Sequence, residues 1–290
     1  MPSFYIVDVK HGNSSVLIDI NGIIIIDAGL RSELLEFLES KGINKIDVLL
    51  FSHSHADHIG GAMALLSPSS KISIDAVYIN TDSENNSELY DDLIYTLYEK
   101  DKMGLINFEE SITPELTGQL NQGDVHIEIL APNECLLSKS KLKPNSMSVV
   151  LRFIYNEEAI ILLTGDMDTI GLKNLLNDKP VMQAKLLVFP HHGGNAGGNM
   201  RQYTQLLCSQ VQAEHIVFSI GDNTDKFPLK AVIEAISSHY PNTTMYTTNH
   251  SILFEQHIKN YLHLQHQNNV GHISINFENI PMQLEFISSN

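Results

Sequence analysis

One short segment limits most strongly what this chain can fold into. Within residues 45–52, the uninterrupted apolar run Val48–Phe51 is typical of a strand that is buried on both faces of a sheet. A turn with three histidines and one aspartate follows within six residues, and Gly60–Leu66 then has the pattern of a helix. We therefore predict a strand whose end presents polar side chains next to the start of a helix.

Short strands and helices are predicted along the rest of the chain as well. The strands come in two groups, each followed by helices, and no linker rich in Pro, Gly or Ser separates the groups. This pattern favours an α+β fold with two mixed sheets packed face to face and helices outside, in a single domain of residues 1–290. An extension of about residues 256–290 is predicted to end in a β-hairpin, which lies on a sheet edge or contacts a second copy or a partner protein.

Composition excludes several classes of protein. The chain has 34 Asp and Glu against 18 Lys and Arg, a formal net charge of −16, which disfavours non-specific binding of long duplex nucleic acid. No apolar run approaches the roughly 20 residues that a membrane span needs. The first ten residues lack the features of a signal peptide, so we expect a cytoplasmic protein that does not bind membranes.

The turn after the apolar run has the spacing HxHxDH, formed by His53, His55, Asp57 and His58. Imidazole and carboxylate groups are ligands for zinc and similar divalent ions. His53 and His55 are two residues apart, so an extended segment directs both side chains the same way. The spacing therefore predicts a metal site, and the alternative is a polar loop whose histidines are incidental.

With Gly60 and Gly61, this turn resembles the HxHxDHxGG signature of the metallo-β-lactamase superfamily. The resemblance extends over about residues 4–254 and includes the motifs IIDAG at Ile25–Gly29, LTGD at Leu163–Asp166 and FPHHGG at Phe189–Gly194. The combination is most similar to the hydrolase domain of ComEC-type DNA-uptake channels and its stand-alone relatives. The resemblance implies a four-layer αββα sandwich of the metallo-β-lactamase type.

The resemblance also implies a site for two divalent ions, zinc or manganese. The implied ligands are His53 and His55 at the first ion, Asp57, His58 and His192 at the second, and Asp166 bridging both. Asp57, Asp166 and His191 are the predicted catalytic residues, with His191 as a partner for an oxygen of the substrate. The order of His191 and His192 stays open, and an N-cap of the next helix is the alternative role for Asp166.

The chain departs from the family pattern at two positions. Asn145 lies where many members supply a third histidine to the first ion, so this site is expected to be weaker and partly occupied, to use water or Asn145, or to prefer manganese. His11 replaces a Gln of the ComEC-like group and either faces the metal loop or is an ordinary turn histidine. Asp27, at the end of a predicted strand, is expected to orient a ligand histidine or else to cap the strand.

These observations predict a hydrolase that attacks with a metal-bound hydroxide. The ComEC-like pattern, the missing third histidine and the PHHG element favour a phosphodiesterase or nuclease, and the acidic composition favours a short or single-stranded substrate. A hydrolase of a carbonyl substrate, such as a lactone, β-lactam or thioester, is one alternative. A catalytically weak partner-binding module is the other.

Overall fold

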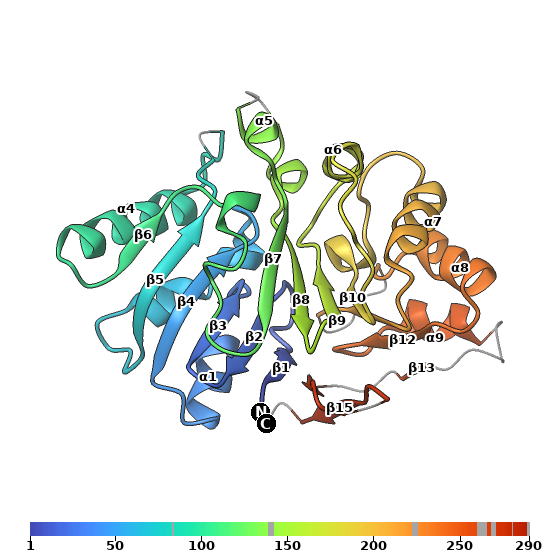
Figure 1. The fold of residues 1–290 in the computed structure, drawn as a ribbon, viewed down its shortest axis with the longest axis horizontal. Helices are drawn as coiled ribbons and strands as arrows, with labels where there is room; N and C mark the ends of the chain where they lie inside the picture. The colour runs from blue at the N-terminus through green and yellow to red at the C-terminus, as the bar shows by residue number, and fades with distance from the viewer. Residues whose placement is uncertain are drawn as a thin grey trace.

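Two mixed β-sheets form the centre of the molecule (Figure 1). The computed structural model describes residues 1–82, 84–138, 142–221, 226–259, 266–267, 271–279 and 281–288. The first sheet has eight strands in the order β15 (Leu284–Ile287), β14 (His272–Asn276), β1 (Ser3–Ile6), β2 (Ser15–Asp19), β3 (Gly22–Ile26), β4 (Lys45–Phe51), β5 (Ser73–Ile79) and β6 (Asn107–Glu109). The second has seven, in the order β13 (His266–Gln267), β12 (Thr244–Thr247), β11 (His215–Phe218), β10 (Leu186–Val188), β9 (Glu158–Leu163), β8 (Val150–Tyr155) and β7 (His126–Ala131).

Helices cover the outer face of each sheet (Figure 1). Those associated with the first sheet are α1 (Glu33–Ser40), α2 (Ala56–Ile59), α3 (Ala62–Leu66) and α4 (Glu88–Lys102). Those that follow in the chain are α5 (Glu134–Leu137), α6 (Thr169–Asn177), α7 (Met200–Val211), α8 (Lys230–His239) and α9 (Ile252–Ile258). This arrangement confirms the predicted αββα sandwich. Among the described residues, no helix is both long and apolar enough to cross a lipid bilayer.

Strand β4 shows how the sequence produces the layers. Side chains alternate along a strand, so Val48 and Leu50 enter the core between the two sheets. Leu49 and Phe51 point the other way, into the core beneath the helices. Both faces of β4 are therefore buried, which explains the continuous apolar run. Burial of large side chains on both faces holds the end of β4, where the histidine turn begins, in a defined position.

The C-terminal segment belongs to the first sheet. Strand β14 pairs antiparallel with β1 and with β15, so the predicted hairpin lies at a sheet edge. Residue 280, in its predicted turn, lies outside the described residues. Contact of this extension with a second copy or a partner stays a prediction.

The single helix predicted at Gly60–Leu66 differs from what the structure contains in this region. The structure has two short helices here, and the first, α2, begins at Ala56 inside the histidine turn. Gly61 separates α2 from α3, and a Cβ atom there would lie 2.1 Å from the carbonyl oxygen of Ala28. The close approach of the chain at Ala28 accounts for this glycine. The consequence is that Asp57 and His58 are carried on a helix.

The two cysteines differ in burial, and this allows a test of the packing of α7. Cys135 is exposed, whereas Cys208 is buried, and burial raises the pKa of the Cys208 thiol to about 12. Thiolate is the reactive form of cysteine, so a native thiol titration at pH 8 is expected to detect one group per chain, and two after unfolding. A Cys135→Ser variant is expected to show none before unfolding. Two rapidly reacting thiols in the native wild type would contradict the buried position of Cys208.

Candidate metal centre

The candidate site lies where loops from both sheets meet. The segment His53–His58 follows β4 of the first sheet, and Asp166 follows β9 of the second. His192 lies in a 3-10 turn, Pro190–Gly193, directly after β10. Because β9 and β10 are adjacent and parallel, their following residues lie at the same edge of the sheet. The three segments thereby bring together side chains that are more than 100 residues apart in the chain.

One group of ligand atoms comes from Asp57, His58, Asp166 and His192. Each residue offers one atom, and these atoms lie within 4.8 Å of one another. Nε2 of His58 is 3.1 Å from Oδ1 of Asp166, and Nε2 of His192 is 3.3 Å from Oδ2 of Asp57. Two imidazoles and two carboxylates facing one point form a donor set that suits a divalent cation.

A second group consists of His53, His55 and Asp166. Nε2 of His53 lies 3.8 Å from Oδ2 of Asp166, whereas Oδ1 of the same carboxylate lies near His58 and His192. Asp166 therefore directs one oxygen toward each group. This is the geometry that a bridging carboxylate requires.

Several ligand atoms of the two groups are buried and unsatisfied. Among the described residues, Nε2 of His53, His58 and His192 and Oδ1 of Asp166 have no hydrogen-bond partner. Leaving one buried polar atom unpaired costs about 1–3 kcal/mol, so four that converge on one place are strongly destabilising together. Bound cations would satisfy all four atoms, and these residues therefore fit a centre of two divalent ions.

A buried network fixes the orientation of the histidines after β4. Nδ1 of His58 is 2.7 Å from Oδ2 of Asp27, and Asp27 accepts hydrogen bonds from the backbone N–H and the hydroxyl of Ser52 at 2.7 and 2.8 Å. The Ser52 hydroxyl oxygen also lies 3.1 Å from Nδ1 of His53. A proton on Nδ1 of His58, held by the carboxylate, leaves the lone pair of Nε2 directed into the centre.

His192 is oriented in the same way by a backbone group. Its Nδ1 lies 2.8 Å from the carbonyl oxygen of Ser219, which places the lone pair of Nε2 toward Asp57 and Asp166. The local backbone is unusual, with φ of 53° at His191 and 57° at His192. Gly193 continues with φ of 79°, and a Cβ atom there would lie 2.5 Å from Cβ of Pro228. These constraints account for the glycine of the PHHG element.

Electrostatics favours the charged carboxylates. Burial alone would raise the pKa of Asp166, but the imidazoles of His58 and His192 hold it well below its usual range. Burial likewise opposes ionisation of Asp57, and the nearby imidazoles of His192 and His58 outweigh this and lower its pKa. Burial and the neighbouring His58 lower the pKa of His53, which keeps that ring neutral. Ionised carboxylates and a neutral imidazole are the ligand forms that bind cations.

His11, Asn145 and His191 surround the centre. Nε2 of His11 lies 3.6 Å from Oδ2 of Asp57, and the His11 side chain is 52% exposed, so it faces the metal loop from the solvent side. His191 belongs to neither group of ligand atoms, and its Nδ1 is 3.3 Å from the amide nitrogen of Asn145. The structure thus places His192 inside the centre and His191 beside it. Oδ1 of Asn145 is buried without a partner among the described residues.

The helix after β9 is capped by a residue other than Asp166. The N-cap of α6 is Asp168, whose carboxylate accepts hydrogen bonds from the backbone N–H groups of Ile170 and Gly171, both at 2.9 Å. The capping alternative for Asp166 is therefore wrong. Asp166 points instead into the centre.

Sequence reasoning missed two residues that support the ligands. Ser52 contacts Asp27, His53 and His58, and its position directly before the HxHxDH motif was the available signal. Ser219 contributes a backbone carbonyl to His192, which no side-chain pattern reveals. Its hydroxyl donates to the carbonyl oxygen of Gly12 at 2.9 Å and ties the two loops together.

Comparison with known proteins agrees with this geometry. A family model described as the metallo-beta-lactamase superfamily matches residues 7–190. The chain is 24% identical over 233 residues to Competence protein ComA of Neisseria gonorrhoeae, covering 80% of this chain and 28% of that protein. It is 23% identical over 209 residues to ComE operon protein 3 of Bacillus subtilis (strain 168), covering 71% and 24%. The chain therefore spans about a quarter of the length of these curated relatives.

Solved structures share the fold at low sequence identity. The metallo-β-lactamase fold protein YhfI of Bacillus subtilis has a TM-score of 0.51 at 12% identity, covering 94% of this chain and 99% of that one. A diphosphatase from the PhnP family has a TM-score of 0.51 at 12% identity, covering 98% and 100%. Tm1679, a metal-dependent hydrolase of the β-lactamase superfamily, has a TM-score of 0.52 at 14% identity, covering 96% and 100%. Since the family model covers more than half of the chain, the protein belongs to the metallo-β-lactamase superfamily, and it carries a His/Asp centre that suits divalent ions.

Proposed function

We propose that this protein is a metal-dependent hydrolase that cleaves phosphodiesters, with short or single-stranded nucleic acid as the favoured substrate class. The observation that carries the proposal is the pair of ligand groups that share Asp166, with His191 beside them but outside both. Two adjacent cations suit an in-line displacement at phosphorus, because both the attacking and the leaving oxygen are then stabilised. One matched curated relative is named a competence protein, and one structure of the same fold is named a diphosphatase, which supports this choice.

Different residues of the chain have different roles in the proposed reaction. When bound, two divalent ions neutralise charge on the phosphate oxygens and make water acidic enough to react at neutral pH. Asp166 would hold both ions, since its two oxygens face different ligand groups. Asp27 and Ser52 hold the ring of His58 in the tautomer that binds. The chain contains no GxSxG motif, so we assign no serine nucleophile.

His191 is suited to contact an oxygen of the substrate. The Asn145 amide nitrogen can only donate, so Nδ1 of His191 accepts and the proton of the neutral ring lies on Nε2. Burial lowers the pKa of His191 and favours this neutral form. The ring then donates a hydrogen bond to a phosphate oxygen as negative charge develops there.

A direct assay separates this function from its alternatives. Purified protein with manganese or zinc is expected to hydrolyse bis(p-nitrophenyl) phosphate and single-stranded oligonucleotides, and to leave a lactone, a β-lactam and a thioester intact. Turnover of a carbonyl substrate with no cleavage of diesters would overturn the proposal. Equal inactivity of the wild type and an Asp57→Ala variant on every ester would favour a partner-binding module.

His191→Gln is expected to lower kcat for the diester about a hundredfold, which is the effect of removing one donor to a developing oxyanion. Its metal content, measured by elemental analysis, is expected to equal that of the wild type, because His191 lies outside both ligand groups. His239→Gln is the matched control, since His239 lies on α8 and contacts Gln205. Loss of an ion in His191→Gln would show that His191 is a ligand, which is incompatible with its proposed contact to the substrate.

A further inference from the structure

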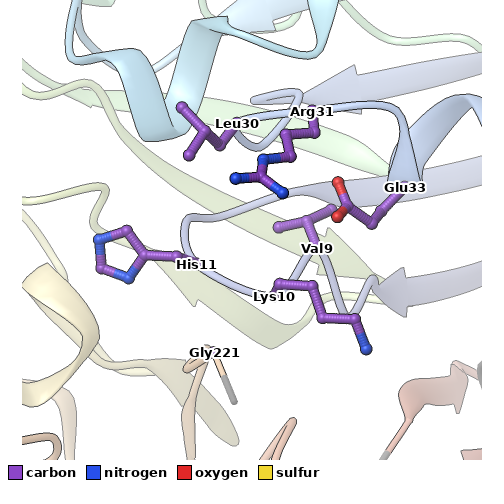
Figure 2. A pocket seen from close by; sticks show the side chains of 7 residues that line it. All are labelled: Val9, Lys10, His11, Leu30, Arg31, Glu33 and Gly221. Carbon is purple, nitrogen blue, oxygen red and sulfur yellow. The ribbon is translucent and has the colours of Figure 1, made fainter. Parts of the chain in front are cut away.

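A pocket beside the metal centre is lined by residues that the proposed reaction does not use. It is a cavity of about 410 Å³ whose walls include Lys10, His11, Leu30, Arg31, Glu33 and Gly221 (Figure 2). The loop before β2, the loop between β3 and α1, and the loop after β11 each contribute to it. A volume of this size is within the range of pockets that hold small ligands, which is roughly 300–1,000 Å³.

His11 connects this pocket to the metal centre. Its Nε2 is 3.6 Å from Oδ2 of Asp57, and its ring centroid is 5.5 Å from that of His192. The loop that carries His11 packs closely against α2, since a Cβ atom at Gly12 would lie 2.0 Å from the carbonyl oxygen of Asp57. A ligand that is bound at the metal centre therefore enters this pocket if it extends past His11.

Arg31 is the side chain in this pocket that is best suited to bind an anion. The chain has three arginines, and two of them are in ion pairs, Arg152 with Glu128 at 2.8 Å and Arg201 with Glu234 at 2.9 Å. Arg31 makes no ion pair with any described residue, although acidic residues outnumber basic ones by 34 to 18. Figure 2 shows its side chain reaching over the loop that carries Lys10 and His11. A guanidinium group with its donors available is the side chain best suited to bind phosphate in a bidentate way.

Other charges of the pocket indicate where the anion lies. Glu33 is on the side opposite His11 in Figure 2, and its carboxylate makes no ion pair within the described part of the chain. Its negative charge repels a phosphate. Lys10 lies 3.8 Å from Asp8, so part of its charge is already compensated. These charges favour a position for the anion at Arg31, away from Glu33 and toward His11.

We infer that this pocket binds a second phosphate group of the substrate, next to the diester that lies at the metal centre. The inference rests on the proposed function and narrows the substrate class to phosphodiester chains with at least two phosphates. It assigns Arg31 as a specificity-determining residue with no part in the bond cleavage itself. An isolated diester is then bound less tightly than a short oligonucleotide.

Binding of thymidine 3′,5′-bisphosphate to the metal-loaded protein tests this directly. The compound contains no diester bond, so it is not consumed, and calorimetry compares it with thymidine 5′-monophosphate. The wild type is expected to bind the bisphosphate about tenfold more tightly than the monophosphate, because one additional charge-assisted contact has about this effect on affinity. In Arg31→Gln this ratio is expected to fall to near one, and in Arg31→Lys to be intermediate. Arg201→Gln, an exposed arginine of another surface, is expected to keep the wild-type ratio.

Kinetics with dinucleotides separates this inference from the proposed function. The wild type is expected to have a lower KM for a 5′-phosphorylated dinucleotide than for the unphosphorylated one, with a similar kcat, and Arg31→Gln is expected to abolish the difference. Cleavage of diesters without any effect of the added phosphate or of Arg31→Gln would overturn the inference and leave the proposed function intact. An Arg31-dependent preference for the bisphosphate, in a protein that cleaves no diester, would support the pocket and overturn the function.

Discussion

Replacement of Asp166 by asparagine is expected to lower kcat/KM for a phosphodiester by on the order of 10³-fold, because both ion positions depend on this carboxylate. Its Oδ1 faces His58 and His192, and its Oδ2 faces His53. Asparagine offers one neutral oxygen in place of two charged ones, so it cannot bridge. Elemental analysis after dialysis is expected to find fewer ions in the variant than in the wild type, with at most one per variant chain.

The matched control for this variant is Asp168→Asn. Asp168 is two residues away and caps α6, and asparagine is an equally good N-cap. We therefore expect wild-type metal content and activity from it. If Asp166→Asn retained two ions and full activity, a centre bridged by Asp166 would be wrong.

Asp27→Asn is expected to weaken metal binding by about 10–100-fold, although Asp27 contacts no ion position. The carboxylate accepts from Ser52 and lies 2.7 Å from Nδ1 of His58. Asparagine keeps one acceptor and adds a donor, so at least one of these buried partners loses its hydrogen bond. The free energy of unfolding is expected to fall by about 1–3 kcal/mol. Asp27 has φ of 62°, a conformation that asparagine tolerates, so backbone strain does not contribute.

Asp19→Asn provides the comparison for Asp27→Asn. Asp19 is also a buried carboxylate that accepts backbone hydrogen bonds, from Ile20 at 2.7 Å and Val125 at 2.9 Å, but it contacts none of the described histidines. Its variant is expected to lose stability and to keep the metal affinity of the wild type. A metal titration followed by denaturant unfolding measures both quantities. Equal loss of affinity in the two variants would mean that Asp27 acts only through stability.

Much of the fold followed from local patterns in the chain. The apolar run Val48–Phe51 predicted a strand buried on both faces, and β4 is such a strand. The short connection Asn156–Glu157 joins β8 to β9, with positive φ at both residues, as a two-residue hairpin of type I′ requires. The bounds of α2 and α3 were not predicted, because the break between them depends on the close approach of Ala28 to Gly61.

The candidate site was likewise predictable from the sequence only in part. The chain order cannot distinguish His191 from His192, since the two are adjacent and of the same type. The structure separates them because both have positive φ and their side chains leave the turn in different directions, with the rings at 89° to each other. Asp166 and Asp168 are likewise alike in sequence, and the start of α6 decides which of them is the cap.

The sequence by itself determined the chemistry of the donors, because four of them lie within one turn and the nature of imidazole and carboxylate does not depend on the fold. Only the tertiary structure decided which donors converge, which partners orient the imidazoles, and that Arg31 and His11 line one pocket. The physical reason is that these relations join segments far apart in the chain, some within the first sheet and some from opposite sheets. Their distances depend on strand order and on how the two sheets pack, and no local pattern encodes either.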